Sequence, residues 1–172
     1  MVRVPVRFLD FDFIVTCVCD VLLFAAVLFN NHYYYATGYT NYASASSLAS
    51  NSTYLGLQGH LVTVTSQDEY DFLKSTFNFT FWIAASDAQK EGSWIWTAGP
   101  DTGLSVSPTL WAPGQPDNGT AANCAVMNST GFADQSCTNF AAAYIIEYEC
   151  QSATTSTCPR EYMCVHCVML HF

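Results

Sequence analysis

A long segment without helical or strand periodicity, residues 98–120, interrupts the second half of the chain. Five prolines and glycines surround its Trp111, at positions 108, 113, 114, 116 and 119. Strand-prone runs flank this segment at residues 79–85, 93–97, 124–127 and 143–149. A loop of this length inside a compact domain is usually either functional or disordered. We therefore expect a β-rich half that carries a long, irregular loop.

Two short helices and two further strands are predicted in the first half of the domain. Residues 42–49 are rich in alanine and serine, and Asn41 is a candidate N-cap. Residues 66–69, Ser-Gln-Asp-Glu, form a capping box that opens a second helix. The apolar face of this helix would carry Tyr70, Phe72 and Leu73. With strands at residues 32–36 and 61–64, the pattern predicts an α+β fold.

Composition argues against disorder and against nucleic-acid binding. The 172 residues suffice for one ordinary domain with flanking segments, and 51% of them are hydrophobic, so a core can form. The net charge is −9, and Lys74 and Lys90 are the only basic residues between positions 30 and 150. Nucleic-acid binding requires clustered cations, so no nucleic-acid partner is expected. Carboxylates in loops suit calcium, although acidity alone also keeps a protein soluble.

Cysteines and glycosylation sequons favour the secretory pathway. Eight cysteines occur, and two of them lie inside the loop-rich body of the chain. Sequons for N-glycosylation begin at Asn51, Asn78, Asn118 and Asn128. Together with the apolar N-terminal segment, these sequons indicate an extracellular protein with disulfide chemistry.

The two ends of the chain are harder to interpret. Residues 13–29 are apolar, follow Arg3 and Arg7, and are about long enough to span a membrane, but they contain Asp20. A signal peptide and a membrane anchor are both open, as are a buried core helix and a wrongly assigned start. In the tail, Cys164-Val-His-Cys167 would be half of a zinc site without a second ligand pair. We therefore expect a signal or anchor at 1–30, a domain at 31–150 and an unassigned cysteine-containing tail at 151–172.

Six motifs follow one another through the predicted domain. They are Gly59-His-Leu-Val-Thr-Val-Thr-Ser-Gln-Asp-Glu69, Trp82-Ile-Ala-Ala85, Ser86-Asp-Ala-Gln-Lys-Glu-Gly-Ser-Trp-Ile-Trp96, Trp111-Ala-Pro-Gly-Gln-Pro-Asp-Asn118, the cysteine motifs Asn123-Cys124 and Asp134-Gln-Ser-Cys137, and Tyr144-Ile-Ile-Glu147. Their order and spacing resemble the C-type lectin family over about residues 32–149. The resemblance implies a C-type-lectin-like fold with two short helices, antiparallel sheets and a long-loop region.

The resemblance also implies one disulfide and the loss of another. Cys124 and Cys137 match the family's inner pair. The family's other disulfide joins the first helix to the last strand. Here no cysteine lies between positions 42 and 59, and Ile146 occupies the last-strand position. We therefore expect a Cys124–Cys137 disulfide and a buried Ile146.

Gln115-Pro116-Asp117 resembles the family's galactose-type motif, in which two oxygens flanking a cis proline bind calcium and sugar hydroxyls. Alternatively, the same residues form an ordinary turn. Asp134 would complete a set of three ligands. Ala122 and Ala133 stand where the family has a glutamate and an asparagine, so calcium affinity should be low.

A second, auxiliary calcium position is also implied by the resemblance. Its candidate ligands are Asp87, Glu91, Asn118 and Asn123, of which the two asparagines stand where acids are usual. Alternatively, Asp87 and Glu91 are solvated loop residues that cap turns.

These observations predict a secreted or cell-surface domain that binds a glycan or glycoprotein, with weak assistance from calcium. The alternative is a calcium-independent protein-interaction or structural module on the same scaffold. Membrane anchoring through residues 13–29 stays open. An enzyme is not expected, because the histidines are scattered and no nucleophile with a partner base is evident.

Overall fold

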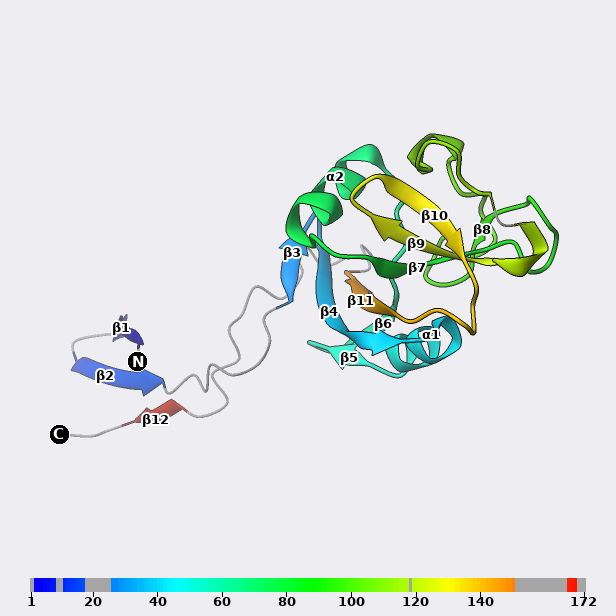
Figure 1. Cartoon of the computed structure of the whole chain (residues 1–172). Helices are drawn as coiled ribbons and strands as arrows, with labels where there is room; N and C mark the ends of the chain where they lie inside the picture. Colours follow the sequence, from blue (N-terminus) through cyan, green and yellow to red (C-terminus); the bar gives the residue numbers. More distant parts are fainter. Residues whose placement is uncertain (1, 9–10, 18–25, 118, 151–166, 170–172) are drawn as a thin grey trace. The chain divides into compact units, whose positions relative to one another are not determined.

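The computed structural model describes residues 2–8, 11–17, 26–117, 119–150 and 167–169 (Figure 1). The chain forms two compact units, one of Met1–Ala25 with Pro159–Phe172 and one of Ala26–Cys158. The first unit holds a three-stranded antiparallel sheet of β1 (Val2–Phe8), β2 (Phe11–Cys17) and β12 (Cys167–Met169).

The apolar segment 13–29, for which a signal peptide, a membrane anchor and a buried core helix were open, is strand at both of its ends, in β2 and in β3 (Val27–Phe29). Its centre, residues 18–25, lies outside the described residues, as do Cys164 and His166 of the tail. Within the described ranges, no helix is long and apolar enough to cross a membrane.

The second unit is an α+β domain built on one sheet with the strand order β10-β9-β7-β11-β4-β3. The strands are β4 (His32–Thr40), β5 (Thr53–Tyr54), β6 (Leu57–Leu61), β7 (Phe81–Ser86), β8 (Ile95–Trp96), β9 (Cys124–Asn128), β10 (Gly131–Gln135) and β11 (Ala142–Glu149). The helices are α1 (Tyr42–Ser50) and α2 (Gln67–Thr76), and short 3-10 turns occupy Pro108–Leu110 and Gly119–Ala121.

Strand β11 organises the sheet. It pairs with β4 along one edge, from Ala142 to Glu149. Its other edge is shared, because Ala143 and Tyr144 pair with β7 and residues 146–148 pair with β6. The pairing with β7 is parallel, a feature that the predicted antiparallel sheets did not include. The other strand pairs of the domain are antiparallel.

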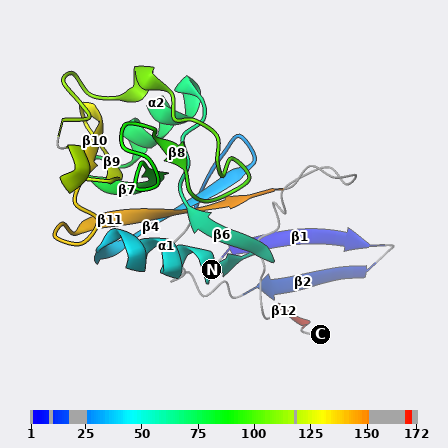
Figure 2. The same cartoon turned by 90° about the vertical axis from the view of Figure 1, so that its right-hand side faces the viewer.

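Two cores lie on opposite faces of this sheet. Along β7, Phe81, Ile83 and Ala85 belong to one buried cluster, and Trp82 and Ala84 belong to the other. Side chains alternate between the faces of a strand, so β7 is covered on both sides. Helix α2 contributes to the first cluster and α1 to the second. Figures 1 and 2 show the two helices on opposite sides of the sheet.

Both helices begin where the sequence predicted. The side chain of Asn41 accepts a hydrogen bond from the Ser44 amide at 3.0 Å, and Ser66 accepts one from the Glu69 amide at 3.2 Å. Glu69 does not return to the Ser66 amide as a capping box would require. Its carboxylate instead accepts from the Thr65 amide at 2.9 Å and is buried.

The predicted strand at 61–64 is wrong beyond Leu61. The Val62 amide donates to the Ile145 carbonyl at 3.0 Å, and the Val62 carbonyl accepts from the Ala84 amide at 2.7 Å. This segment therefore crosses from β11 to β7 instead of continuing along either strand. The predicted strand at 93–97 is likewise reduced to Ile95–Trp96.

The cysteine predictions are confirmed within the described residues. Cys124 and Cys137 form a disulfide. Ile146 is buried in the cluster that contacts α1, at 5% exposure. Cys150 is also disulfide-bonded, and its amide donates to the Asn31 carbonyl at 3.2 Å.

Candidate functional site

The long loop between β8 and β9 is held against the sheet at its middle. Trp111 forms a parallel bridge with Phe132 of β10, and the Ala112 amide donates to the Phe132 carbonyl at 2.9 Å. The Trp111 ring also lies edge-on to Trp94, with centroids 4.7 Å apart. Trp111 is half-buried, while Trp82, Trp94 and Trp96 are core residues. These contacts fix the point from which residues 113–123 project.

Gln115, Asp117 and Asp134 are linked to one another through their backbones and side chains. The Gln115–Pro116 peptide is cis. Gln115 Oε1 accepts a hydrogen bond from the Asp134 amide at 3.1 Å, and Asp134 Oδ1 accepts one from the Asp117 amide at 3.0 Å. Asp134 is buried on β10, whereas Asp117 is exposed at the tip of the loop. The structure therefore brings together all three residues of the predicted ligand set.

Asp87 follows the last residue of β7, and Asn123 precedes the first residue of β9. Ser86 pairs with Cys124, so the next antiparallel position sets Asp87 opposite Asn123, and Ser86 Oγ donates to the Asn123 carbonyl at 2.6 Å. Asp87 is only 3% exposed, and its Oδ2 accepts from the Gly92 amide at 2.9 Å. Asp87 Oδ1 and Asn123 Oδ1 are both buried and have no hydrogen-bond partner among the described residues.

Two unpartnered buried oxygens at facing positions are costly unless a cation joins them, because each loses its hydration without replacement. Oxygen donors of this kind suit calcium. Asp87 is thus not a solvated loop residue, although it does cap the 87–92 turn as the alternative held.

The other candidate ligands differ in their placement. Glu91 is exposed, and its Oε1 would lie 3.9 Å from a Cβ added at Gly119, so it faces the loop tip. Asn118 lies outside the described residues. Ala122 and Ala133 are both buried, at 4% and 8% exposure, and they supply no ligand oxygen from their side chains.

A family model of the Lectin C-type domain matches residues 46–158. The chain belongs to the C-type lectin family. It is 33% identical over 134 residues to the alpha-N-acetylgalactosamine-specific lectin of Patiria pectinifera, covering 74% of this chain and 76% of that lectin. It is also 33% identical over 118 residues to the mouse low affinity immunoglobulin epsilon Fc receptor, and 39% identical over 92 residues to halomucin of Haloquadratum walsbyi.

Coverage differs greatly among these relatives. The matched part is 67% of this chain and 33% of the Fc receptor, and 53% of this chain and 1% of halomucin. Among solved structures, the cow carbohydrate-recognition domain of CD23 in the presence of GlcNAc2Man3 oligosaccharide matches with a TM-score of 0.62 and 28% identity. That match covers 77% of this chain and 99% of the cow domain.

A calcium-independent type II antifreeze protein matches with a TM-score of 0.60 and 22% identity, covering 76% of this chain and 93% of that protein. At this identity the likeness shows the fold alone. These matches confirm the C-type-lectin-like fold predicted from the motif order.

A cluster of histidines around buried glutamates was missed by the sequence interpretation. His32 Nδ1 lies 2.5 Å from Glu147 Oε1, and Tyr34 Oη donates to Glu69 Oε1 at 2.7 Å. His60 Nε2 lies 3.3 Å from Glu149 Oε1, an ion-pair distance without hydrogen-bond geometry. A signal was present, because Glu147 interrupts the otherwise apolar run Tyr144 to Tyr148.

The charges of this cluster perturb one another. The hydrogen bond with Glu147 raises the pKa of His32 above its usual value, although burial opposes it. Burial and the nearby charge of Glu147 raise the pKa of the Glu69 carboxyl. For His60, burial lowers the pKa, but the contact with Glu149 and the charge of Glu147 together outweigh it and raise the pKa.

Proposed function

We propose that this domain is a carbohydrate-binding lectin whose loop site uses calcium weakly. Hydrogen bonds from the Asp117 amide to Asp134 Oδ1 and from the Asp134 amide to Gln115 Oε1 join the three residues at the loop, and this linkage is the observation that carries the proposal. A calcium ion held there would bind two vicinal sugar hydroxyls, because it accepts about 6–8 oxygen ligands and the protein supplies only some of them.

The auxiliary calcium position, at the base of the loop, supports this function. Asp87 and Asn123 offer the two buried oxygens described above, and Glu91 faces the loop at Gly119. An ion bound by them would tie the end of β7 to the segment before β9. That segment carries the loop tip, so the ion would stiffen the sugar-binding loop.

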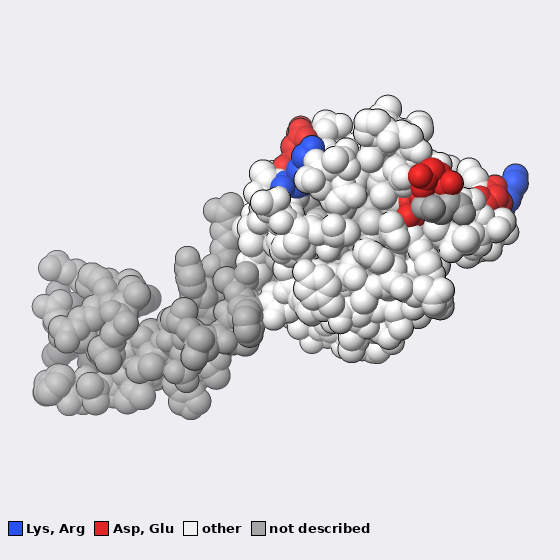
Figure 3. All heavy atoms as spheres, in the orientation of Figure 1, with Lys and Arg blue, Asp and Glu red and all other residues white. Residues whose placement is uncertain are grey.

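Three observations support the ligand class. The Gln-Pro-Asp order resembles the galactose-type motif, and the relative from Patiria pectinifera is an alpha-N-acetylgalactosamine-specific lectin. Much of the surface in Figure 3 is uncharged, and its acidic side chains gather in a few places. We therefore propose a neutral hexose of the galactose type, carried on a glycan or glycoprotein, as the ligand.

An extracellular location is part of the same proposal. Asn51 and Asn78 are exposed, so their sequons are accessible to glycosylation. The Asn128 side chain accepts hydrogen bonds from both the amide and the hydroxyl of Thr130 in its own sequon. With the Cys124–Cys137 disulfide, these features suit a secreted or cell-surface protein. Cleavage or anchoring at residues 13–29 stays a prediction.

Calorimetric titration of the full chain with calcium tests the proposal most directly. We expect saturable binding with a dissociation constant in the high-micromolar to millimolar range, typical of extracellular modules. Retention on immobilised N-acetylgalactosamine should require calcium and be reversed by free galactose, but not by free mannose.

Asp117→Asn should abolish retention, because it removes the charge at the loop tip. Asp71→Asn is the matched control, since Asp71 is an exposed acid on α2 and should leave retention unchanged. Calcium-independent retention, or equal loss in both variants, would contradict the proposal.

A second candidate function rests on Ala122 and Ala133. Both side chains are buried and apolar where the resemblance implies a glutamate and an asparagine, so the loop could serve calcium-independent recognition of a protein. In that case no calcium would bind to the wild type. The Ala122→Glu, Ala133→Asn double variant would then also show no binding, whereas under the lectin proposal it should bind calcium at least about tenfold more tightly.

A further inference from the structure

A groove lies between helix α2 and the turn that joins β3 to β4, and none of its residues belongs to the loop site. Its volume is about 660 Å³, a size that suits a side chain or a small ligand. Two aromatic rings, two carboxylates, an amide and a hydroxyl line it, from Phe29, Asn30, Asp68, Asp71, Phe72 and Ser75. The four polar side chains are exposed, so the groove is open to solvent.

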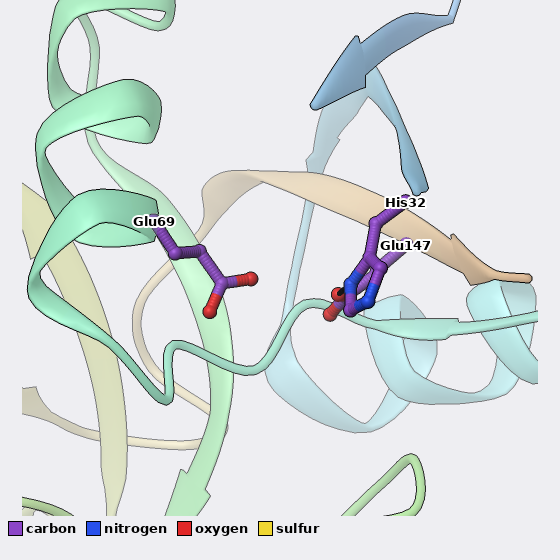
Figure 4. Close-up of side chains that lie close together, drawn as sticks. All are labelled: His32, Glu69 and Glu147. Atoms are coloured by element: carbon purple, nitrogen blue, oxygen red, sulfur yellow. Dashed lines mark hydrogen bonds and ion pairs between the residues drawn. The ribbon is translucent and has the colours of Figure 1, made fainter. Parts of the chain in front are cut away.

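One face of α2 forms the first wall of the groove. Counted from Asp68, the residues three, four and seven positions further along are Asp71, Phe72 and Ser75, so all four lie on the same face of the helix. Glu69 does not belong to this face. It is buried, and Figure 4 shows its carboxylate directed toward the two side chains from β4 and β11.

A tight hairpin turn fixes the opposite wall. Phe29 of β3 pairs with His32 of β4, and the two residues between them, Asn30 and Asn31, have φ of 45° and 66°. Positive φ at both central positions is the geometry of a type I′ turn, which matches the twist of paired strands. Phe29 is thereby held against α2, where its ring stacks on Phe72 with centroids 4.2 Å apart and planes 3° apart.

The two carboxylates of the groove have no cationic partner among the described residues. Asp71 Oδ1 accepts a hydrogen bond from Gln67 Nε2 at 3.1 Å, while the Asp68 carboxylate accepts none within the described ranges. Lys74, the basic residue of α2, lies over the Tyr70 ring instead, with Nζ 5.5 Å from its centroid. Like charges three positions apart on a helix repel each other, so a cation bound between them would stabilise both.

We propose that this groove binds an arginine side chain from a basic segment of another protein. A guanidinium group is planar and always charged, so its donors can bind Asp68 and Asp71 while its plane lies along the paired rings. A lysine ammonium is more strongly hydrated and cannot stack in this way. A quaternary ammonium prefers free ring faces, whereas Phe29 and Phe72 turn one face of each ring toward the other.

Charge argues against a second copy of this chain as the occupant. The net charge is −9, and Lys74 and Lys90 are the only basic residues between positions 26 and 150. Two copies therefore repel each other and have few cations to offer. Charge complementarity points to a different, basic protein.

The test is an NMR titration of the isotope-labelled full chain with a glycine-flanked arginine peptide at physiological salt. We expect saturable shifts, largest at the amides of Asn30, Phe72 and Ser75, with a dissociation constant of about 1 mM or below. Asp71→Asn should weaken binding by about fivefold, the effect of one exposed arginine–carboxylate pair. Phe29→Leu keeps an apolar side chain without the ring and should weaken binding by about threefold. The lysine peptide should bind at least about threefold more weakly than the arginine peptide.

Asp117→Asn is the matched control, because it removes an exposed acid from the loop site and leaves the groove intact. It should bind the peptide as the wild type does, whereas Asp71→Asn should lose peptide binding but keep sugar retention. Circular dichroism checks that the variants are folded.

Four outcomes would overturn the proposal. They are the absence of saturable shifts at the groove, equal losses in Asp71→Asn and Asp117→Asn, equal binding of the lysine peptide, and self-association that Asp71→Asn removes. The last outcome, measured by sedimentation velocity, would assign the groove to a second copy of the chain. Sugar retention is measured separately, so failure of the lectin proposal is distinguishable from failure of this one.

Discussion

Replacing Asp87 by asparagine separates the structural role of this residue from its proposed role as a calcium ligand. In the wild type, Asp87 Oδ2 accepts from the Gly92 amide, while Oδ1 is buried without a partner among the described residues. An unsatisfied buried polar group costs about 1–3 kcal/mol. In Asp87→Asn the amide oxygen can retain the Gly92 contact, and a neutral NH2 group replaces the unpartnered anionic oxygen. We expect this variant to gain about 1 kcal/mol of stability in calcium-free buffer.

Calcium should reverse the order of stability. With a dissociation constant of about 1 mM, 10 mM calcium stabilises the wild type by about 1.4 kcal/mol, or about 5 °C in Tm. Asp87→Asn loses an anionic ligand and should show less than half of this response. The assay is urea and thermal unfolding with EGTA or with 10 mM calcium, and Asp71→Asn serves as the exposed control. The reasoning is refuted if Asp87→Asn lowers stability in EGTA while its calcium response equals that of the wild type.

Three further outcomes are expected. The pKa values of His32 and Glu69 are raised above 6.5 and 4.5, so the folded state holds protons that the unfolded state releases. The free energy of unfolding in EDTA should therefore fall as pH rises from about 5 to 8, as measured in thermal scans. A flat or rising profile would contradict this expectation. Gly131→Ala should lower the free energy of unfolding in urea by at least about 2 kcal/mol, since Gly131 has φ 141° and an added Cβ would lie 2.6 Å from a backbone nitrogen. Gly38→Ala is the control, because an added Cβ there meets open space and should leave stability unchanged. Enzymatic removal of N-glycans from secreted protein should lower its mass, and an unchanged mass would refute glycosylation.

Local signals explain most of what the sequence predicted correctly. Asn41 and Ser66 each satisfy an amide three residues ahead, which is a contact that neighbouring residues alone specify. The motif order predicted the fold and the Cys124–Cys137 disulfide. Both features depend on motif residues that are present in this sequence in the family's order.

Contacts between distant segments explain what the sequence did not reveal. Val62 bonds to Ala84 and Ile145, which lie 22 and 83 positions further along the chain, so no local periodicity describes it. His32 and Glu147 are 115 positions apart and meet only because β4 pairs with β11. Glu69 was interpreted as part of a capping box, but its buried carboxylate accepts a hydrogen bond from the Tyr34 hydroxyl, which approaches from another element.

The pairing of β4 with β11 also determines how the domain would respond to mechanical force. The two strands are antiparallel, and His32, the first residue of β4, is opposite Glu149, the last residue of β11. Tension applied between these two residues would act on one end of the ladder and break its pairs in succession, not all together in shear. The first pair under load contains His32, whose Nδ1 lies 2.5 Å from Glu147 Oε1 on the opposite strand, so this contact would resist separation at the point where unzipping begins.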